Sequence, residues 1–172
     1  AKKNGDNYEI TGEKTFVIDG NSASLLIVAA RTDGNVDDES GITLFLVDPS
    51  ADGLEITKTS MVDSRNSAQI KFNNVVVSSS ETLGELNNGS GLLENVLDRA
   101  QIAISAEMLG NASQAFDITL EYLKERKQFG AVIGTFQALQ HRAAEMYSEL
   151  ELTKSSVIAA CNAVDDNSND LK

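Results

Sequence analysis

The chain has 172 residues, enough for one or two small hydrophobic cores, and 41% of them are hydrophobic, as in ordinary folded domains. Asp and Glu outnumber Lys and Arg by 26 to 14, so the formal net charge is -12. Because nucleic acids and anionic membranes bind basic surfaces, this charge argues against both as partners. The only cysteine, Cys161, excludes an intrachain disulfide, and a reducing, cytoplasmic location fits it best. No apolar run is long enough to cross a bilayer.

The first 80 residues show the pattern of short β-strands. Gly12-Glu13 predicts a turn, and so does the stretch 48–53, which contains the only proline. The continuous apolar run at 25–30 is typical of a buried strand. Short strands at this spacing favour an antiparallel sandwich or barrel. The predicted strands lie at 8–11, 15–18, 25–30, 42–47, 54–57, 69–72 and 75–77.

Residues 90–165 show the pattern of two long helices. Apolar side chains recur at intervals of three and four from Leu93 to Leu123, and again from Phe136 to Val164. Each helix is about thirty residues long, which exceeds the usual length in globular proteins. Two such helices cannot bury all of their apolar faces against each other. We therefore expect further helices to pack on them, from the same protein, from another chain, or from both.

The sequence contains no recognisable metal-binding or nucleophile motif. One His and one Cys do not supply the clustered ligands of a metal site. His141 lies within a predicted helix and no serine lies in a nucleophile-elbow sequence, so the plain interpretation of His141 is a helix residue bonded to a neighbour. The chain contains neither G-x-G-x-x-G nor a P-loop.

The junction between the two predicted helices, R-K-Q-F-G-A-V-I-G-T-F-Q-A-L-Q-H-R at 126–142, carries a candidate site. Arg126, followed by Phe129 and Gly130, places a cation and a flat ring near one helix end. Such groups can bind phosphate through paired hydrogen bonds and cover an aromatic ring system. The alternative is a plain helical hairpin, with Phe129 and Phe136 in the core and Arg126 exposed.

This junction and the rest of the sequence resemble the acyl-CoA dehydrogenase family, whose members use FAD. The C-terminal helical signature of that family is similar to E-Y-L-K-E-R-K-Q-F-G-A-V-I-G-T-F-Q-A-L-Q-H-R-A-A-E-M, and Y-E-I-T-G-E-K-T-F-V-I-D-G resembles the segment that enters its middle β domain. G-I-T-L-F-L-V-D, V-D-S-R-N-S-A-Q-I-K-F-N-N-V-V-V and A-E-M-L-G also match, in order. The resemblance implies an α+β fold, with an antiparallel β-sandwich or barrel-like middle domain at 1–85, incomplete at its N-terminus. Residues 86–172 would then be the first two long antiparallel helices of an incomplete four-helix bundle, and the chain a fragment of a longer protein.

The resemblance assigns cofactor contacts to the junction. In the family, the Arg, the Phe and the later Gln of R-x-x-F-G-x(6)-Q reach the FAD of a neighbouring subunit, and here these are Arg126, Phe129 and Gln137. A local positive charge of this kind can hold a dianionic pyrophosphate on an otherwise acidic protein.

A second cofactor contact is implied in the β half of the chain. Phe16, Val17 and Ile18 resemble the family's flavin-contacting Trp-Ile-Ser/Thr. Phe16 stands where Trp is usual, and Ile18 replaces a residue with a hydroxyl. Main-chain contacts to the flavin can remain, but a side-chain hydrogen bond from position 18 cannot.

The resemblance also implies substrate contacts, at Asp98, Arg99, Ala100 and Gln101, which match the part of the first helix that lines the acyl-CoA site. The family usually has Arg where Gln101 stands, and some members carry the catalytic Glu where Ala100 stands. No residue of this chain matches the catalytic base, which most members place later in the sequence. Asp98 is offset from the alternative base position and points elsewhere on a helix. We therefore assign no catalytic residue and expect the isolated chain to be inactive.

The activity implied is FAD-dependent α,β-dehydrogenation of an acyl-CoA thioester, an oxidoreductase reaction of fatty acid metabolism. A carboxylate removes the α proton while the β hydrogen leaves as hydride to the flavin. The implied partners are the acyl-CoA substrate, an electron-transfer flavoprotein or similar acceptor, and further subunits in a homodimer, a homotetramer or a pair with a related subunit. No metal, nucleic acid or membrane is expected. Two alternatives remain: a non-catalytic subunit of a heteromeric acyl-CoA dehydrogenase, which Ile18 and Gln101 support, and an interaction module made of a β-sandwich and a helical hairpin.

Overall fold

The computed structural model describes residues 1–166. The chain divides after Glu94 into two compact units, which are described separately below. Helix α1 (Ser90–Glu125) begins in the first unit and continues into the second. The domain boundary at residues 85 and 86 therefore stays a prediction.

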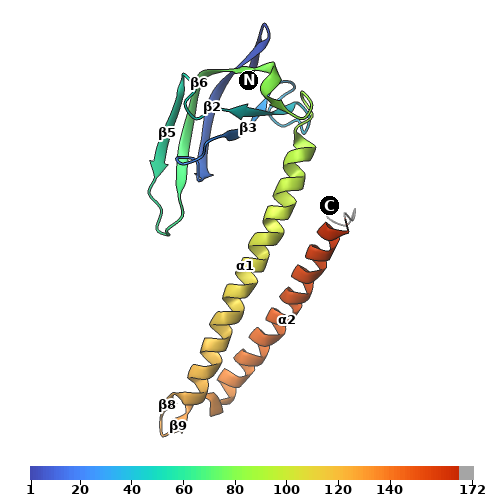
Figure 1. The fold of residues 1–172 in the computed structure, drawn as a ribbon. Coiled ribbons are helices and arrows are strands. Elements are labelled where there is room, and N and C mark those ends of the chain that lie inside the picture. Colours follow the sequence, from blue (N-terminus) through green and yellow to red (C-terminus); the bar gives the residue numbers. More distant parts are fainter. Residues whose placement is uncertain (167–172) are drawn as a thin grey trace. The chain divides into compact units, whose positions relative to one another are not determined.

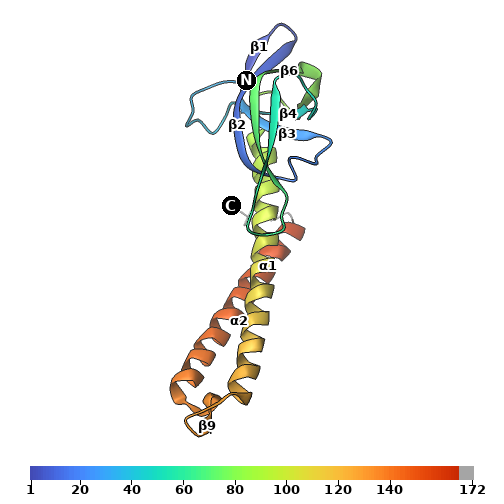
Figure 2. The same cartoon turned by 90° about the vertical axis from the view of Figure 1, so that its left-hand side faces the viewer.

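The first unit consists of two antiparallel sheets, seen from two directions in Figure 1 and Figure 2. The larger sheet has the strand order β1-β2-β6-β5 and the smaller sheet has the order β3-β4-β7. The two longest strands, β2 and β6, are paired from one end to the other. The elements are β1 (Lys2–Asn4), β2 (Asn7–Ile18), β3 (Leu26–Arg31), β4 (Ile42–Val47), β5 (Leu54–Thr59), β6 (Ser67–Ser78), the 3-10 turn η1 (Ser79–Glu81) and β7 (Thr82–Leu83).

The core of this unit lies between the two sheets, because alternate side chains of each sheet point inward. Phe45 on β4 is fully buried, and its ring centroid lies 5.2 Å from that of Tyr8 on β2. This arrangement confirms the predicted antiparallel β-sandwich. The buried cluster consists of Tyr8, Ile10, Leu26, Val28, Phe45, Val47, Ala68, Ile70, Phe72, Val75 and Val77.

Two predicted strand breaks are wrong. Gly12-Glu13 is not a turn, because β2 continues through it; the pairing of β2 with β6 shifts register between Ile10 and Gly12 and again between Lys14 and Val17. Such bulges absorb extra residues without ending a strand. The segments predicted at 69–72 and 75–77 are likewise one strand, β6.

The apolar run at 25–30 is not buried throughout, contrary to the prediction. Leu26 and Val28 face the core, but Leu25 is 52% exposed and Ile27 is 63% exposed. β3 is an edge strand of the smaller sheet, and within this unit only one face of that sheet is covered by the other. A continuous apolar run therefore leaves its alternate side chains uncovered here.

One arginine organises the polar loop between β3 and β4. The guanidinium of Arg31 donates hydrogen bonds to the main-chain oxygens of Asp33, Val36, Asp38 and Ser40, at 2.7 to 3.2 Å. Only arginine offers enough donors in one rigid plane to reach so many carbonyls at once.

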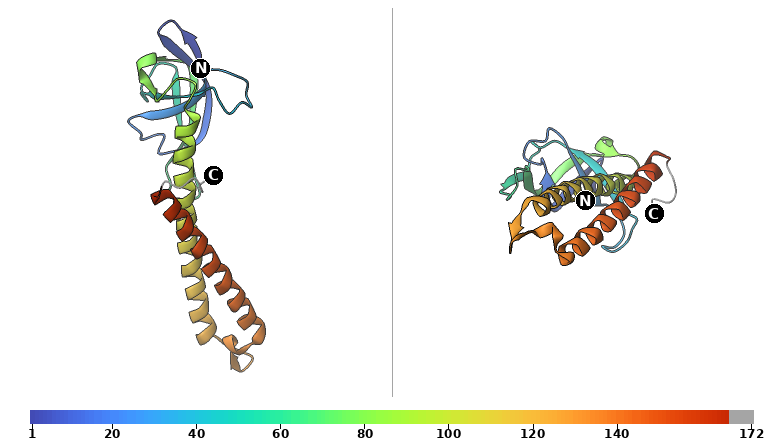
Figure 3. Two further views of the ribbon diagram at one scale, coloured as in Figure 1. Left: turned by 90° about the vertical axis from the view of Figure 1, so that its right-hand side faces the viewer. Right: turned by 90° about the horizontal axis from the view of Figure 1, so that it is seen from below.

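The second unit is a pair of antiparallel helices joined by a short hairpin (Figure 1 and Figure 3). The elements after α1 are β8 (Lys127–Gln128), β9 (Ala131–Val132), the 3-10 turn η2 (Ile133–Thr135) and α2 (Gln137–Asp165). Together with the β-sandwich, this pair confirms the α+β fold class.

The two helices leave most of their apolar side chains uncovered. Phe116 is the one buried residue among the described positions of α1 and α2. Ile104 is 57% exposed, Met108 66% and Tyr147 57%. This exposure agrees with the expectation that further helices pack on the pair. Neither helix, over its described residues, is long and apolar enough to cross a membrane.

Candidate cofactor site

The junction predicted as a cofactor site is a tight β-hairpin between α1 and α2. Its strands β8 and β9 pair antiparallel, and the N–H of Ile133 donates to the carbonyl oxygen of Arg126 at 2.8 Å. The two turn residues, Phe129 and Gly130, have φ angles of 53° and 78°. Two successive positive φ angles are characteristic of the type I′ hairpin turn, which usually contains Asn-Gly or Asp-Gly. Here a phenylalanine occupies the first of these positions.

Phe129 combines a strained backbone with an exposed ring. The left-handed region costs an L-residue about 1–2 kcal/mol, and Asn and Asp tolerate it best. The described non-glycine residues at positive φ are Asp19, Asn74 and Asn87, which belong to that tolerant class, and two phenylalanines, Phe16 and Phe129. Phe129 is 95% exposed and Phe16 is 64% exposed. Since strained residues cluster at functional sites, these two rings are the strongest local signs of a ligand site.

The alternative of a plain helical hairpin with both rings in the core is wrong for Phe129, which is almost fully exposed. Its ring lies edge-on to that of Phe136, with the centroids 6.5 Å apart, and Phe136 is itself 37% exposed. The ring of Phe129 therefore contributes little to the packing of this unit and is open to a ligand.

Arg126 directly precedes the hairpin, and Gln137 is the first residue of α2 after it. Both carry polar side chains. Neither side chain forms an ion pair or a hydrogen bond with any of residues 1–166. By contrast, Nη1 of Arg142 forms an ion pair with Oε2 of Glu145, 3.6 Å away. An unpaired guanidinium can bind phosphate through two parallel hydrogen bonds, and a free amide offers donors and an acceptor.

The second predicted segment lies at the end of β2. The pairing register shifts between Lys14 and Val17, and Phe16 lies at this irregularity, so its ring turns outward. Ile18, opposite Ser67 on β6, is 80% exposed. A cavity of about 260 Å³ opens between this end of β2 and β3, and Val17 lines it.

Two buried polar atoms near Ile18 lack partners among the described residues: the side-chain oxygens of Asn66 and Ser67. A buried oxygen without a partner is costly unless a further donor reaches it, so these two oxygens are available to accept hydrogen bonds. No sequence pattern indicated these two residues, because an orphaned oxygen depends on the packing around it.

The predicted substrate segment lies on α1, far from the hairpin. The backbone rise from Arg99 to Arg126 is about 40 Å for a helix of this length. Four consecutive residues, Asp98 to Gln101, also point around the helix in steps of about 100°, so one ligand can meet only part of this segment. The guanidinium of Arg99 donates to the carbonyl oxygen of Asn95 at 3.3 Å. The role of all four residues in substrate binding stays a prediction.

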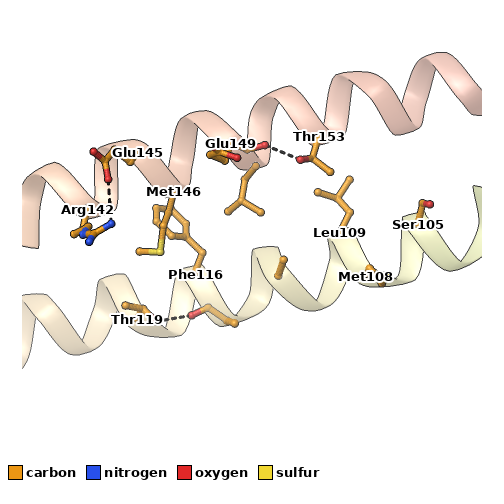
Figure 4. Close-up of a pocket in the computed structure, with 13 residues that line it drawn as sticks. Ser105, Met108, Leu109, Phe116, Thr119, Arg142, Glu145, Met146, Glu149 and Thr153 are labelled. Atoms are coloured by element: carbon orange, nitrogen blue, oxygen red, sulfur yellow. Dashed lines mark hydrogen bonds and ion pairs between the residues drawn. The ribbon is translucent and has the colours of Figure 1, made fainter.

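A cavity of about 800 Å³ forms a groove between α1 and α2 and contains none of the predicted site residues. Figure 4 shows Phe116 and Met146 facing each other across it, with Arg142 and Glu145 at one end. Most of its lining is apolar and comes from side chains at helical spacing, which suits a packed helix better than a small polar ligand. Within residues 1–166, no three His, Cys, Asp or Glu side chains gather as metal ligands.

Two family patterns match this sequence: Acyl-CoA dehydrogenase, middle domain, over residues 1–75, and Acyl-CoA dehydrogenase, C-terminal domain, over residues 87–172. The chain therefore belongs to the acyl-CoA dehydrogenase family, as the sequence resemblance predicted.

Particular relatives fit this assignment. The mitochondrial short/branched chain specific acyl-CoA dehydrogenase of Bos taurus is 37% identical over 157 residues, which are 90% of this chain and 36% of that protein. The three-dimensional structure of butyryl-CoA dehydrogenase from Megasphaera elsdenii matches with a TM-score of 0.87 and 28% identity, over 99% of this chain and 45% of that one. An FAD complex of PigA matches with a TM-score of 0.90 and 25% identity, over 98% of this chain and 45% of that one. The chain thus spans less than half the length of these proteins.

Proposed function

We propose that the chain is part of an FAD-dependent acyl-CoA dehydrogenase, an oxidoreductase that forms the α,β double bond of an acyl-CoA thioester. The observation that carries this proposal is the conformation of Phe129, whose backbone is strained while its 95% exposed ring contributes little to the packing of the chain. Family membership makes FAD the expected ligand, and one structural neighbour is described as an FAD complex.

The residues of the hairpin fit the adenosine and pyrophosphate side of FAD. Arg126 would hold the pyrophosphate through charge-assisted hydrogen bonds, which are about twice as strong as neutral ones. The exposed ring of Phe129 would cover a flat part of the cofactor, and the free amide of Gln137 would bond its polar groups. None of the three groups has to give up an existing polar partner among the described residues to do so.

The end of β2 fits the flavin ring. Phe16 would offer an exposed aromatic side chain, and Val17 and Ile18 would offer main-chain groups and apolar contact. Ile18 has no hydroxyl, so any hydrogen bond to the flavin at this position must come from the main chain. When bound, FAD would accept the β hydrogen of the substrate as hydride.

The remaining half of the reaction is removal of the α proton, and no residue of this chain is assigned to it. Asp98 to Gln101 would contribute to one wall of the acyl-CoA site. Because this segment and Arg126 lie about 40 Å apart along α1, they would serve different cofactor copies. We therefore propose a homo-oligomer, or a pair with a related subunit, in which each hairpin completes the FAD site of a neighbour.

We also propose an electron-transfer flavoprotein or a similar acceptor as the redox partner, in fatty acid metabolism. The cytoplasmic location and the tetrameric state stay predictions, as does the inactivity of the isolated chain.

A second candidate function is a non-catalytic subunit that pairs with an active relative. The absence of a hydroxyl at the 80% exposed Ile18 and the amide of Gln101 favour it. The interaction module is not proposed, because both halves of the chain match the enzyme family.

The test is a visible spectrum of the full-length protein, followed by anaerobic addition of a panel of acyl-CoA thioesters. A flavin band that one thioester bleaches is the result expected for the dehydrogenase. A flavin band that no thioester bleaches would favour the non-catalytic subunit. A protein that neither contains nor takes up FAD would contradict both forms of the proposal.

A further inference from the structure

Two glutamines in the first turn of α2 differ in whether their side chains form hydrogen bonds. Gln137 has no partner among residues 1–166, whereas Nε2 of Gln140 donates to the carbonyl oxygen of Gly134 at 2.9 Å. No side chain caps the start of α2 at Phe136. The amide of Gln140 thus connects α2 through a side-chain hydrogen bond to the turn η2 that precedes it.

The acceptor of this hydrogen bond is itself held in place. A Cβ atom added at Gly134 would lie 2.7 Å from the carbonyl oxygen of Leu123, so the backbone of η2 lies directly against the last turns of α1. Gln140 therefore connects the first turn of α2 to a fixed point. The main-chain N–H of Phe136 donates to Ile133, whereas those of Leu139 and Gln140 donate to Phe136. Within residues 1–166, no main-chain hydrogen bond therefore joins a residue of α2 to one of η2.

We propose that Gln140 is a positioning residue that sets the orientation of Gln137 toward the cofactor. The two side chains are three residues apart, so they share one face of the helix. Fixing the end of Gln140 on Gly134 fixes the rotation of the first turn of α2, and with it the direction of the Gln137 amide. This inference rests on the proposed function, since Gln137 is the residue through which it would affect FAD.

The test is a double-mutant cycle on FAD affinity in the full-length, FAD-free protein. Gln140→Met removes the donor at nearly constant size, and Gln137→Ala removes the residue on which Gln140 acts. Loss of one such hydrogen bond should raise the dissociation constant for FAD about three- to tenfold in the otherwise unchanged protein. In the Gln137→Ala background the same change should raise it less than about twofold, because the coupling is gone.

Gln114→Met is the matched control, since Gln114 is an exposed glutamine on α1 away from the hairpin. It should leave FAD affinity and thermal stability unchanged. Equal effects of Gln140→Met in both backgrounds, or no effect in either, would overturn the proposal, because a general structural role does not depend on Gln137.

Amide hydrogen exchange separates this inference from the proposed function. In the FAD-free protein, Gln140→Met should speed exchange in the segment 133–140, and unchanged exchange there would overturn the positioning role. If the wild-type protein binds no FAD, the proposed function fails, while the exchange result still decides whether Gln140 orders this turn.

Discussion

Phe129 allows backbone strain and cofactor binding to be separated by substitution. Phe129→Asn should stabilise the FAD-free protein by about 1 kcal/mol, because relief of a left-handed L-residue is worth about 1–2 kcal/mol. The ring is 95% exposed, so removing it loses little packing. Burial of one-twentieth of an aromatic surface of about 200 Å² is worth only about 0.25 kcal/mol. The strain is the larger quantity, and the net change is therefore stabilising.

Phe129→Ala is the matched control, because alanine removes the ring but keeps a Cβ at positive φ. Thermal denaturation of the FAD-free full-length protein should place the Asn variant about 2 °C above wild type, and the Ala variant within about 1 °C of it. FAD titration should show weaker binding for both variants. A loss of stability in the Asn variant would refute the strain argument, and unchanged FAD affinity in both variants would refute the cofactor contact.

Other predictions concern the β-sandwich. Phe45→Ala should cost about 3–5 kcal/mol in urea denaturation, because the side chain is fully buried against Tyr8; a cost below 1 kcal/mol would contradict the described core. Arg31→Lys keeps the charge but loses the planar guanidinium, so protease should cut the β3–β4 loop faster than in wild type. Equal cleavage rates would show that the hydrogen bonds of Arg31 do not hold this loop. The side chain of Ser50, and to a smaller extent its backbone N–H, donates a hydrogen bond to the carboxylate of Asp48 and lowers its pKa. Because the pKa of Asp48 is lower in the folded protein, these bonds stabilise the fold above the ordinary pKa of Asp, and this stabilisation is lost as pH falls through the folded pKa. An NMR titration of Asp48 should show a midpoint below the ordinary Asp value. Ser50→Ala should raise that midpoint.

The helices and the fold class could be predicted because long apolar periodicity is a local property. The repeats ending at Leu123 and at Val164 each correspond to one helix of the structure. The pattern of β2 was harder to interpret, since whether Gly12 makes a turn or a bulge depends on the pairing of β2 with β6. The burial of Ile27 was mispredicted for a related reason, because hydrophobicity does not say which face of a sheet is covered.

The candidate site could be located from sequence only as far as residue type and motif allow. Arg126 and Phe129 stood out as a cation and a ring at a helix junction, but the positive φ of Phe129 became visible only in the structure. The orphaned oxygen of Ser67 and the tie from Gln140 to Gly134 have no sequence signature, because each arises from contacts that the local pattern does not encode.

If the hairpin between α1 and α2 binds the pyrophosphate side of FAD, the substitution Arg126→Ala must weaken FAD binding, and an FAD titration of this variant measures that effect. The matched control is Arg142→Ala, which removes an arginine of the same unit that already has a carboxylate partner, Glu145. Loss of charge-assisted hydrogen bonds worth about 1.5–3 kcal/mol should raise the FAD dissociation constant about 10- to 150-fold for Arg126→Ala. The control should change it less than about threefold. Equal effects of the two substitutions, or none from Arg126→Ala, would show that the hairpin does not bind the pyrophosphate through Arg126.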